Sequence, residues 1–311
     1  MPSVTNVVFV GTPFADDSSA LFTDLGLAGN DILEGDAGDD LLSGLDGIDQ
    51  IKGEVGNDTL LGGLGNDSLF GGEDLDKLYG QDGADYLEGG SSADTVSGGL
   101  GDDLIYGDNA GFDELGEAGN DYLYGGSGSD TIYGEGADDT LFGNSDADLL
   151  DGGTGDDVLY GGAGNDVIFG RDGSDIIEGG SGSDTMTGGA GADTFVFKPT
   201  TDFRAGYVDV ITDFDVNEDK IDLSAFGLGI PESDAAQNNG ANQFAFDDFS
   251  NGMTQGLESA FYQVGADVHI GTRENLGYNL GSLGQGATNN SLVVIENVNI
   301  DDLGGSNFEF S

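Results

Sequence analysis

The sequence has no cysteine, no tryptophan and very little positive charge, since only 7 Lys+Arg residues stand against 60 Asp+Glu in a chain of 311 residues. The absence of cysteine excludes disulfides, thiolate metal ligands and a cysteine nucleophile. The formal net charge of −53 repels nucleic-acid phosphates and anionic lipids, so we expect no binding to nucleic acid or to a membrane surface. No apolar run approaches the roughly 20 residues that span a bilayer, so we expect no transmembrane segment.

Histidine is nearly absent too, and this limits the chemistry that the chain can perform. The one histidine, His269, lies in an apparent strand, where a structural role is the usual one. One histidine cannot supply a zinc-binding H-E-x-x-H motif, and the sequence has no G-x-S-x-G nucleophile turn. The 25 residues before Gly26 are too few for a separate catalytic domain. We therefore predict that the protein is not an enzyme.

The beginning of the chain lacks the marks of a cleaved secretory signal. Residues 1–10 have no basic region and only a short apolar run at 7–10. We expect that the protein either stays inside the cell or leaves it by a route that does not read the N-terminus.

A nine-residue repeat occupies the middle of the chain. Cutting the sequence every nine residues from Gly26 to Val196 gives nineteen units, all of which begin with glycine. Eighteen of them have Asp at position 6, and eighteen have an apolar residue at position 8. A clear copy is GGAGNDVIF at 161–169. A period held over 171 residues indicates a solenoid of stacked units.

The residue types predict the shape of each unit. Glycine at positions 1, 2 and 4 permits the backbone angles of a tight turn over the first six residues. Positions 7 to 9 are often β-branched or aromatic and predict a short strand, with position 8 on the opposite side from positions 7 and 9. Two units then make one coil, and stacked coils make two parallel sheets around a core of position-8 residues.

The tenth unit, 107–115, departs from the pattern, because Phe112 stands at position 6 and Glu114 at position 8. Two alternatives remain open for it. The unit either bulges out of the solenoid or forms a turn without a metal site.

Aromatic residues recur at position 9 of several units. Tyr106, Tyr124, Phe142 and Tyr160 are eighteen residues apart and would lie on successive coils of one sheet if the tenth unit is a regular coil. The last three share a face in either case. We favour cross-strand stacking that stabilises the sheet. The alternative is a docking surface for the tail or for a partner.

The position-6 aspartates predict a metal site in each turn. Stacking places their carboxylates above one another, where they would push the coils apart unless cations neutralise them. The glycine-rich turns also leave carbonyl oxygens without ladder partners, and an all-oxygen site favours Ca²⁺ over Zn²⁺, Cu²⁺ or Mg²⁺. A lone Asp after Gly is usually a turn residue, but eighteen in one phase indicate columns of ligands. The predicted metal ligands are Asp31, Asp40, Asp49, Asp58, Asp67, Asp76, Asp85, Asp94, Asp103, Asp121, Asp130, Asp139, Asp148, Asp157, Asp166, Asp175, Asp184 and Asp193.

The units follow the pattern G-G-x-G-x-D-x-U-x, and the block resembles the RTX (haemolysin-type) calcium-binding nonapeptide repeat. The resemblance implies an all-β fold, namely a right-handed parallel β-roll (a solenoid) with Ca²⁺ held between turns by aspartates and backbone carbonyls. It also implies export by the type I secretion machinery through an uncleaved C-terminal signal. The protein would then be extracellular, either secreted or associated with a cell surface.

The chain after the repeats resembles the C-terminal region of serralysin-type secreted proteases. The likeness rests on GGAGADTFVF at 188–197, DVITDF at 209–214, DKIDLSAF at 219–226 and the chain end at 291–298 and 308–311. Asp209 and Asp213 lie on one face of a predicted strand, either as caps or as further ligands. Segment 231–290, rich in Asn, Gln and Gly, departs from the serralysin pattern.

Together these patterns predict three parts: an N-terminal capping segment at 1–25, the RTX calcium-binding β-roll at 26–197, and a β-rich C-terminal cap with the secretion signal at 198–311. With two intervals lost at the tenth unit, we expect roughly fifteen Ca²⁺ sites and folding on calcium binding outside the cell. One alternative is a structural or adhesive cell-surface protein whose segment 231–290 binds a glycan or surface partner. Another is an accessory subunit of a co-secreted enzyme.

Overall fold

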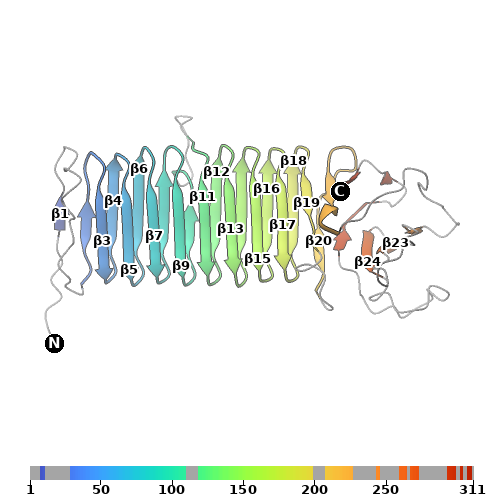
Figure 1. Ribbon diagram of the computed structural model, residues 1–311, viewed down its shortest axis with the longest axis horizontal. Coiled ribbons are helices and arrows are strands. Elements are labelled where there is room, and N and C mark those ends of the chain that lie inside the picture. The colour runs from blue at the N-terminus through green and yellow to red at the C-terminus, as the bar shows by residue number, and fades with distance from the viewer. Residues whose placement is uncertain are drawn as a thin grey trace.

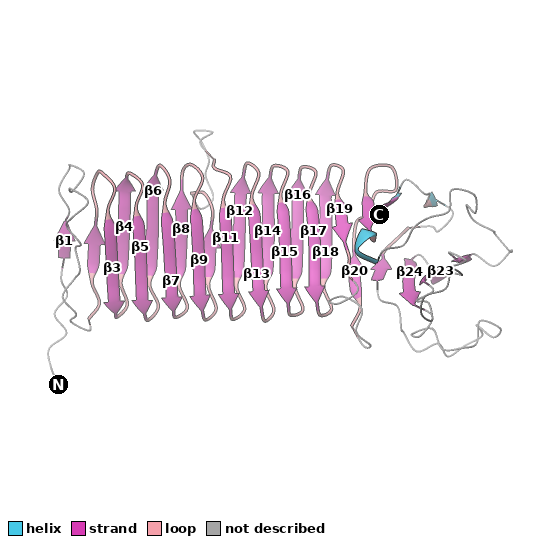
Figure 2. Cartoon of the chain, viewed as in Figure 1, coloured by secondary structure: helices cyan, strands magenta, loops and turns pink. Residues whose placement is uncertain are grey.

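The repeat block is a parallel β-solenoid of about nine turns, in which consecutive strands alternate between two sheets (Figure 1). The computed structural model describes residues 8–10, 29–109, 118–198, 207–226, 243–245, 259–264, 267–272, 293–298, 302–303 and 307–309. Strands and turns make up nearly all of this described chain, and η1 (Ser224–Phe226) is a short 3-10 helix (Figure 2). The predicted all-β roll of stacked repeats is confirmed.

Two sheets form the walls of the solenoid, and every pairing between their repeat strands is parallel. In spatial order the first sheet, sheet A, contains β1 (Val8–Val10), β2 (Ile32–Glu34), β4 (Gln50–Val55), β6 (Ser68–Glu73), β8 (Tyr86–Gly90), β10 (Leu104–Tyr106), β12 (Thr131–Gly136), β14 (Leu149–Thr154), β16 (Val167–Asp172), β18 (Thr185–Ala190), β20 (Asp209–Ile211), β25 (Val293–Ile295), β24 (Asp267–Thr272), β23 (Ser259–Val264) and β22 (Gln243–Ala245). Sheet B contains β26 (Phe308–Glu309), β21 (Lys220–Asp222), β19 (Thr194–Val196), β17 (Ile176–Ser181), β15 (Val158–Ala163), β13 (Thr140–Ser145), β11 (Tyr122–Ser127), β9 (Thr95–Leu100), β7 (Lys77–Asp82), β5 (Thr59–Leu64) and β3 (Leu41–Asp46).

The strands are longer than the sequence pattern predicts. Most contain six residues, so a strand such as β15 runs from position 7 of one unit to position 3 of the next. The turn is correspondingly confined to positions 4 to 6. The six-residue turn predicted from the glycines is therefore wrong, because the residues at positions 2 and 3 still pair with the neighbouring coil, as Gly162 does with Asn144.

Position 1 needs glycine for space rather than for its backbone angle. In β5, for example, Gly62 faces inward next to the turn aspartate, and a Cβ there would lie 2.6 Å from Asp67 Oδ2 and 2.6 Å from the carbonyl oxygen of Gly80. Positions 2 and 4 are the ones that take positive φ, as in Gly63 (φ 124°) and Gly65 (φ 126°). The conformational role predicted for glycine thus belongs to two of the three positions.

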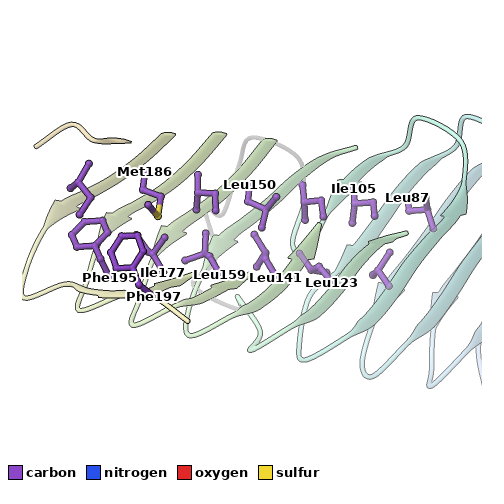
Figure 3. Packing of buried hydrophobic residues seen from close by; sticks show 14 of the residues in the cluster. Leu87, Ile105, Leu123, Leu141, Leu150, Leu159, Ile177, Met186, Phe195 and Phe197 are labelled. Atoms are coloured by element: carbon purple, nitrogen blue, oxygen red, sulfur yellow. The ribbon is translucent and has the colours of Figure 1, made fainter. Parts of the chain in front are cut away.

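The core is the column of position-8 residues predicted from the sequence. Each of the eighteen position-8 residues in the described repeats is at most 5% exposed, and most are fully buried. Figure 3 shows Leu123, Leu141 and Leu159 on one side of the interior, with Leu87, Ile105 and Leu150 facing them from the other sheet. Each coil contributes only two such residues, so the core side chains pack on their equivalents in the neighbouring coils.

Truncating one core residue should destabilise the whole stack. We expect Leu141→Ala to lower the free energy of unfolding of the calcium-loaded protein by about 2–5 kcal/mol, since a void would separate Leu123 from Leu159. Thermal unfolding followed by circular dichroism measures the effect. Leu100→Ala is the matched control, because Leu100 is 55% exposed, and equal losses from both variants would contradict the core assignment.

The tenth unit is not a coil of the solenoid. Strand β10 pairs with β12 and strand β9 with β11, in both cases with partners 27 residues apart instead of 18. The stack therefore skips one nine-residue unit between Asn109 and Ala118, and Ala118 forms a bridge with Ser92. Of the two alternatives, the bulge is correct. Phe112 and Glu114 lie outside the described residues.

Strands from outside the repeats continue both sheets at their ends. At the first coil, β1 pairs with β2. At the last coil, β20 and then β25 extend sheet A, while β21 and then β26 extend sheet B. Beyond β25, sheet A turns antiparallel through β24, β23 and β22. His269 lies in β24, where its backbone pairs with Tyr262 and Val294, as the strand prediction requires.

Candidate metal centre

The eighteen predicted aspartates form two columns along the edges of the solenoid. In each column the Oδ1 atom of one aspartate accepts a hydrogen bond from the backbone N–H of the aspartate one coil earlier, at 2.7–2.9 Å. Column I contains Asp31, Asp49, Asp67, Asp85, Asp103, Asp130, Asp148, Asp166 and Asp184. Column II contains Asp40, Asp58, Asp76, Asp94, Asp121, Asp139, Asp157, Asp175 and Asp193.

The second carboxylate oxygen of these residues has a different environment. All the column aspartates except Asp40 are buried, at 0–3% exposed. Fifteen Oδ2 atoms are buried and have no hydrogen-bond partner among the described residues, and they belong to Asp58, Asp67, Asp76, Asp85, Asp94, Asp103, Asp121, Asp130, Asp139, Asp148, Asp157, Asp166, Asp175, Asp184 and Asp193. A buried, uncompensated carboxylate oxygen costs a protein several kcal/mol, so an array of them points to a missing positive ligand.

Carbonyl oxygens complete the surroundings of each second carboxylate oxygen. The point where a Cβ of Gly161 would sit is 2.5 Å from Asp166 Oδ2 and 2.5 Å from the carbonyl oxygen of Gly179 in the next coil. Gly62, Asp67 and Gly80 repeat the arrangement. Carboxylate and carbonyl oxygens that converge in this way are the ligand types of Ca²⁺, which takes six to eight oxygen ligands in a flexible geometry, whereas Mg²⁺ demands a near-ideal octahedral one.

Side chains alone would not hold the ion. Among the described residues, no group of three Asp, Glu, His or Cys side chains is placed to bind a metal. A site in the columns therefore needs the backbone carbonyls as well as the carboxylates, as the sequence pattern predicts.

Burial strongly perturbs the ionisation of the column residues. Desolvation raises the pKa of Asp148, Asp166 and Asp175 to about 7, while the backbone N–H that each accepts acts in the opposite direction. Repulsion from neighbouring aspartates adds to the increase. Without a cation, the folded columns thus hold charge at a high electrostatic cost near neutral pH.

The tail adds one aspartate to each column. Asp209 Oδ1 accepts from the N–H of Asp184 at 3.0 Å, and Asp219 Oδ1 accepts from that of Asp193 at 3.1 Å. Asp219 differs from the repeat aspartates because its Oδ2 also accepts an N–H, from Asp215 at 2.7 Å. The sequence does not single out Asp219, because its spacing from Asp193 is not a multiple of nine and leaves no periodic signal.

Asp213 has a different role from Asp209, although the sequence predicts that both lie on one face of a strand. Its two carboxylate oxygens accept the N–H groups of Gly188 and Gly189, both at 2.9 Å. Asp213 is therefore a cap of the last repeat turn, and Asp209 extends column I. Of the two alternatives for this pair, the cap is confirmed for Asp213, and a role as a further ligand stays a prediction for Asp209.

A second ladder, at position 5, was also missed. Asn or Asp side chains there accept the N–H of position 5 in a neighbouring coil, as Asp138 does from Asp156 at 2.9 Å and Asn165 does from Ser183 at 2.9 Å. The frequent Asn or Asp before the position-6 aspartate was the available signal. These side chains are exposed, so they stabilise the turns without forming a buried site.

The position-9 aromatics stack, as favoured from the sequence. Tyr124 and Phe142 have ring centroids 4.8 Å apart and ring planes at 2°, and Phe142 and Tyr160 follow at 4.9 Å and 9°. Tyr106 lies on the other sheet, against Tyr133 at 5.0 Å, because the tenth unit is not a coil. The rings cover one another along the sheet, which favours the stabilising role over a docking surface.

The fold and the columns define a class: a β-solenoid whose turns carry stacked, buried carboxylates beside backbone carbonyl oxygens. The sequence model described as RTX calcium-binding nonapeptide repeat (4 copies) matches residues 25–51, 43–78, 52–87, 79–110, 115–150, 142–177 and 169–197, which together exceed half of the chain. The chain belongs to this family and is a Ca²⁺-binding repeat protein of the RTX type.

Similar solved structures include two repeat modules of a mannuronan C5-epimerase from Azotobacter vinelandii. The AlgE6R3 subunit is 27% identical over 54% of this chain and 80% of its own, with a TM-score of 0.35. The AlgE6R2 subunit is 26% identical over 58% of this chain and 92% of its own, with a TM-score of 0.28. Superpositions this poor leave the fold of the present chain to be argued from its own strands. No curated protein matches the chain.

Two further expectations concern the serralysin-like tail and the absence of a transmembrane segment. The match to the RTX repeats ends at residue 197, so the resemblance of 198–311 to serralysin tails stays a prediction. Within the described residues, no helix has the length and apolar character needed to cross a bilayer.

Proposed function

We propose that the chain is a secreted, non-catalytic protein whose β-roll folds when Ca²⁺ binds between its turns. The observation that carries the proposal is the set of fifteen buried Oδ2 atoms without a hydrogen-bond partner among the described residues. In the cytosol, where Ca²⁺ is scarce, the carboxylates would keep the chain expanded and fit for export. Outside the cell, millimolar Ca²⁺ would couple binding to folding, because the unfolded chain lacks the sites.

The eighteen column aspartates are the proposed ligands, together with carbonyl oxygens of neighbouring coils. The columns pass the repeat break without a gap, since Asp94 donates to Asp121 at 2.7 Å and Asp103 donates to Asp130 at 2.8 Å. This continuity favours intervals that run across the break over the loss of two intervals there. Eight intervals remain in each column, so about sixteen ions, rather than fifteen, would bring about +32 against the net charge of −53.

Asp166→Asn separates a metal ligand from a simple turn cap. Asn keeps an oxygen for the N–H of Asp148 and offers an N–H₂ group to the carbonyl of Gly179. We therefore expect the variant to lower the midpoint temperature in calcium, by roughly 4–8 °C per kcal/mol lost in a small cooperative unit, and to leave the chelated protein no less folded. Thermal unfolding in 5 mM CaCl₂ and in EDTA measures both effects.

Asp172, an exposed residue at the end of strand β16, provides the control, because Asp172→Asn removes the same charge outside the columns. If Asp166→Asn destabilised the protein equally with and without calcium, Asp166 would be a cap and the ligand assignment would fail.

We also propose that the three parts keep the roles expected from the sequence: 1–25 and 198–311 close the two ends of the roll, and the end of the tail directs type I export. The pairing of β1 with β2 and of β20 and β21 with the last repeat strands supports the closing roles, because capped solenoids avoid aggregation through open edges. Expression beside a type I exporter, with and without the last residues, tests the signal. A cell-surface partner for 231–290 remains the alternative function.

A further inference from the structure

The break in the repeat creates a turn that the nine-residue pattern does not contain. Gly107 takes the place of the position-1 glycine, because a Cβ added there would meet Asp121 Oδ2 and would lie 2.8 Å from the carbonyl oxygen of Gly134. Residues 118–121, up to the column aspartate Asp121, complete this turn. We call the turn built from 107–109 and 118–121 the hybrid turn.

Asp108 occupies position 2 of the hybrid turn and is buried there, at 3% exposed. Acidic residues at position 2 of intact turns are more exposed to solvent, since Asp36 and Glu135 are half-buried and Glu54 is exposed. The side chain is held inward by a hydrogen bond, in which Asp108 Oδ1 accepts the N–H of Gly119 at 3.0 Å. Its Oδ2 lies 3.8 Å from the position that a Cβ of Gly136 would take in the next coil.

The hybrid turn therefore adds a carboxylate to column II between three others. Asp94, Asp121 and Asp139 are each 1% exposed, and their Oδ2 atoms have no hydrogen-bond partner among the described residues. Burial is the main cause that raises the pKa of Asp94 to about 9 and that of Asp139 to about 10. Repulsion from neighbouring carboxylates, including Asp108, adds to the increase. These two values exceed the pKa of about 7 that burial above all gives Asp121 in the hybrid turn and Asp148 and Asp166 in column I.

We propose that Asp108 makes the intervals on either side of the hybrid turn the strongest cation sites of the roll, which fill before the others. The inference rests on the proposed calcium binding of the columns. Elsewhere an interval has two column carboxylates, whereas here a third negative charge lies within the same buried space. Asp108 acts through its charge, because no three carboxylates of the described residues are placed to bind a metal together. At an effective dielectric constant of about 20, one added charge within about 6 Å of a divalent ion is ample for a tenfold gain in affinity.

The test uses Asp108→Asn in the full chain. Asn keeps the oxygen that accepts the Gly119 N–H and removes only the charge. Calcium binding is followed by isothermal titration in the presence of a competing chelator, and circular dichroism at saturating calcium reports folding. We expect the first ions bound by the wild type to bind about 10-fold more weakly to the variant, with the later ions unchanged. Asp36→Asn, at position 2 of an intact turn, is the matched control and should bind like the wild type.

Equal titrations for Asp108→Asn and Asp36→Asn would overturn the inference. So would a variant that fails to fold at saturating calcium, because the inference gives Asp108 an effect on affinity and not on the fold. Asp108→Ser, a second neutral acceptor, checks that outcome. The proposed function fails separately, if the wild type itself takes up no calcium.

Discussion

Chelation of calcium should unfold the β-roll, and this is the largest effect that we expect. A site at a ligand concentration of 100 Kd contributes about 2.7 kcal/mol to the folded state, whereas a whole domain is stable by only about 5–15 kcal/mol. Loss of a few ions from the columns would therefore exceed the total stability of the roll. The buried carboxylates would then repel each other, with the fifteen Oδ2 atoms uncompensated. Circular dichroism in EDTA should show the loss of most β structure between 29 and 198, and its return on adding excess CaCl₂.

Two controls make this result specific. Excess MgCl₂ should restore much less structure, because Mg²⁺ gives up its water reluctantly and demands an octahedral site. High NaCl should not substitute for calcium either, since screening is weak for buried charges. A chain that keeps its full β content in EDTA would refute calcium-coupled folding.

The sequence predicts the regular part of this molecule well because each property repeats. A single apolar position per nine residues is enough to place Leu69 and Ile168 in the core, and both are fully buried. The same phase places the aspartates in two columns, with the inter-coil hydrogen bonds spaced eighteen residues apart. Periodicity constrains the answer because an error of one residue would turn every core side chain outward.

The parts that the sequence did not predict are those where the period stops or the chain meets itself from afar. Nothing in the phase shows that unit 107–115 is skipped, because nine inserted residues keep the count intact while the coils close behind them. For the same reason, nothing in the sequence marks Asp108 as a buried residue. Likewise, Asp213 and Asp219 act on the last coil through backbone N–H groups of Gly188, Gly189 and Asp193, and such contacts depend on how the tail folds back.

The hydrogen bonds at the end of the roll also explain how the tail can close column II without a further ion. Both oxygens of Asp213 and both oxygens of Asp219 accept backbone N–H groups. Buried repeat aspartates such as Asp175 and Asp193 accept a backbone N–H at Oδ1 alone. At the last aspartate of column II, peptide N–H donors thus take the place that a cation would have, and this gives that column an end.

Acid should partly take the place of calcium in the metal-free chain, which is the second large effect that we expect. Burial above all raises the pKa of Asp67 and Asp130 to about 6, and that of Asp76 and Asp103 to about 7, from an ordinary value of 3.8. Below 3.8 these groups are neutral in both states and the folded columns carry no charge penalty. As the pH rises from 3.8 through about 7, the unfolded chain ionises first, so the metal-free roll progressively loses stability.

In calcium the direction reverses, because the ion needs the ionised carboxylates and must compete with protons below about pH 7. In EDTA, we therefore expect more β structure at pH 5 than at pH 8, whereas in millimolar CaCl₂ the midpoint temperature should be lower at pH 5 than at pH 8. Circular dichroism and thermal unfolding at the two pH values measure both trends, above the calculated pI of about 4.1. The opposite slopes distinguish the columns from the exposed acidic surface, because surface carboxylates that bind no ion would make acid favour the folded state in both solutions. Parallel slopes would show that the carboxylates govern stability only through general repulsion.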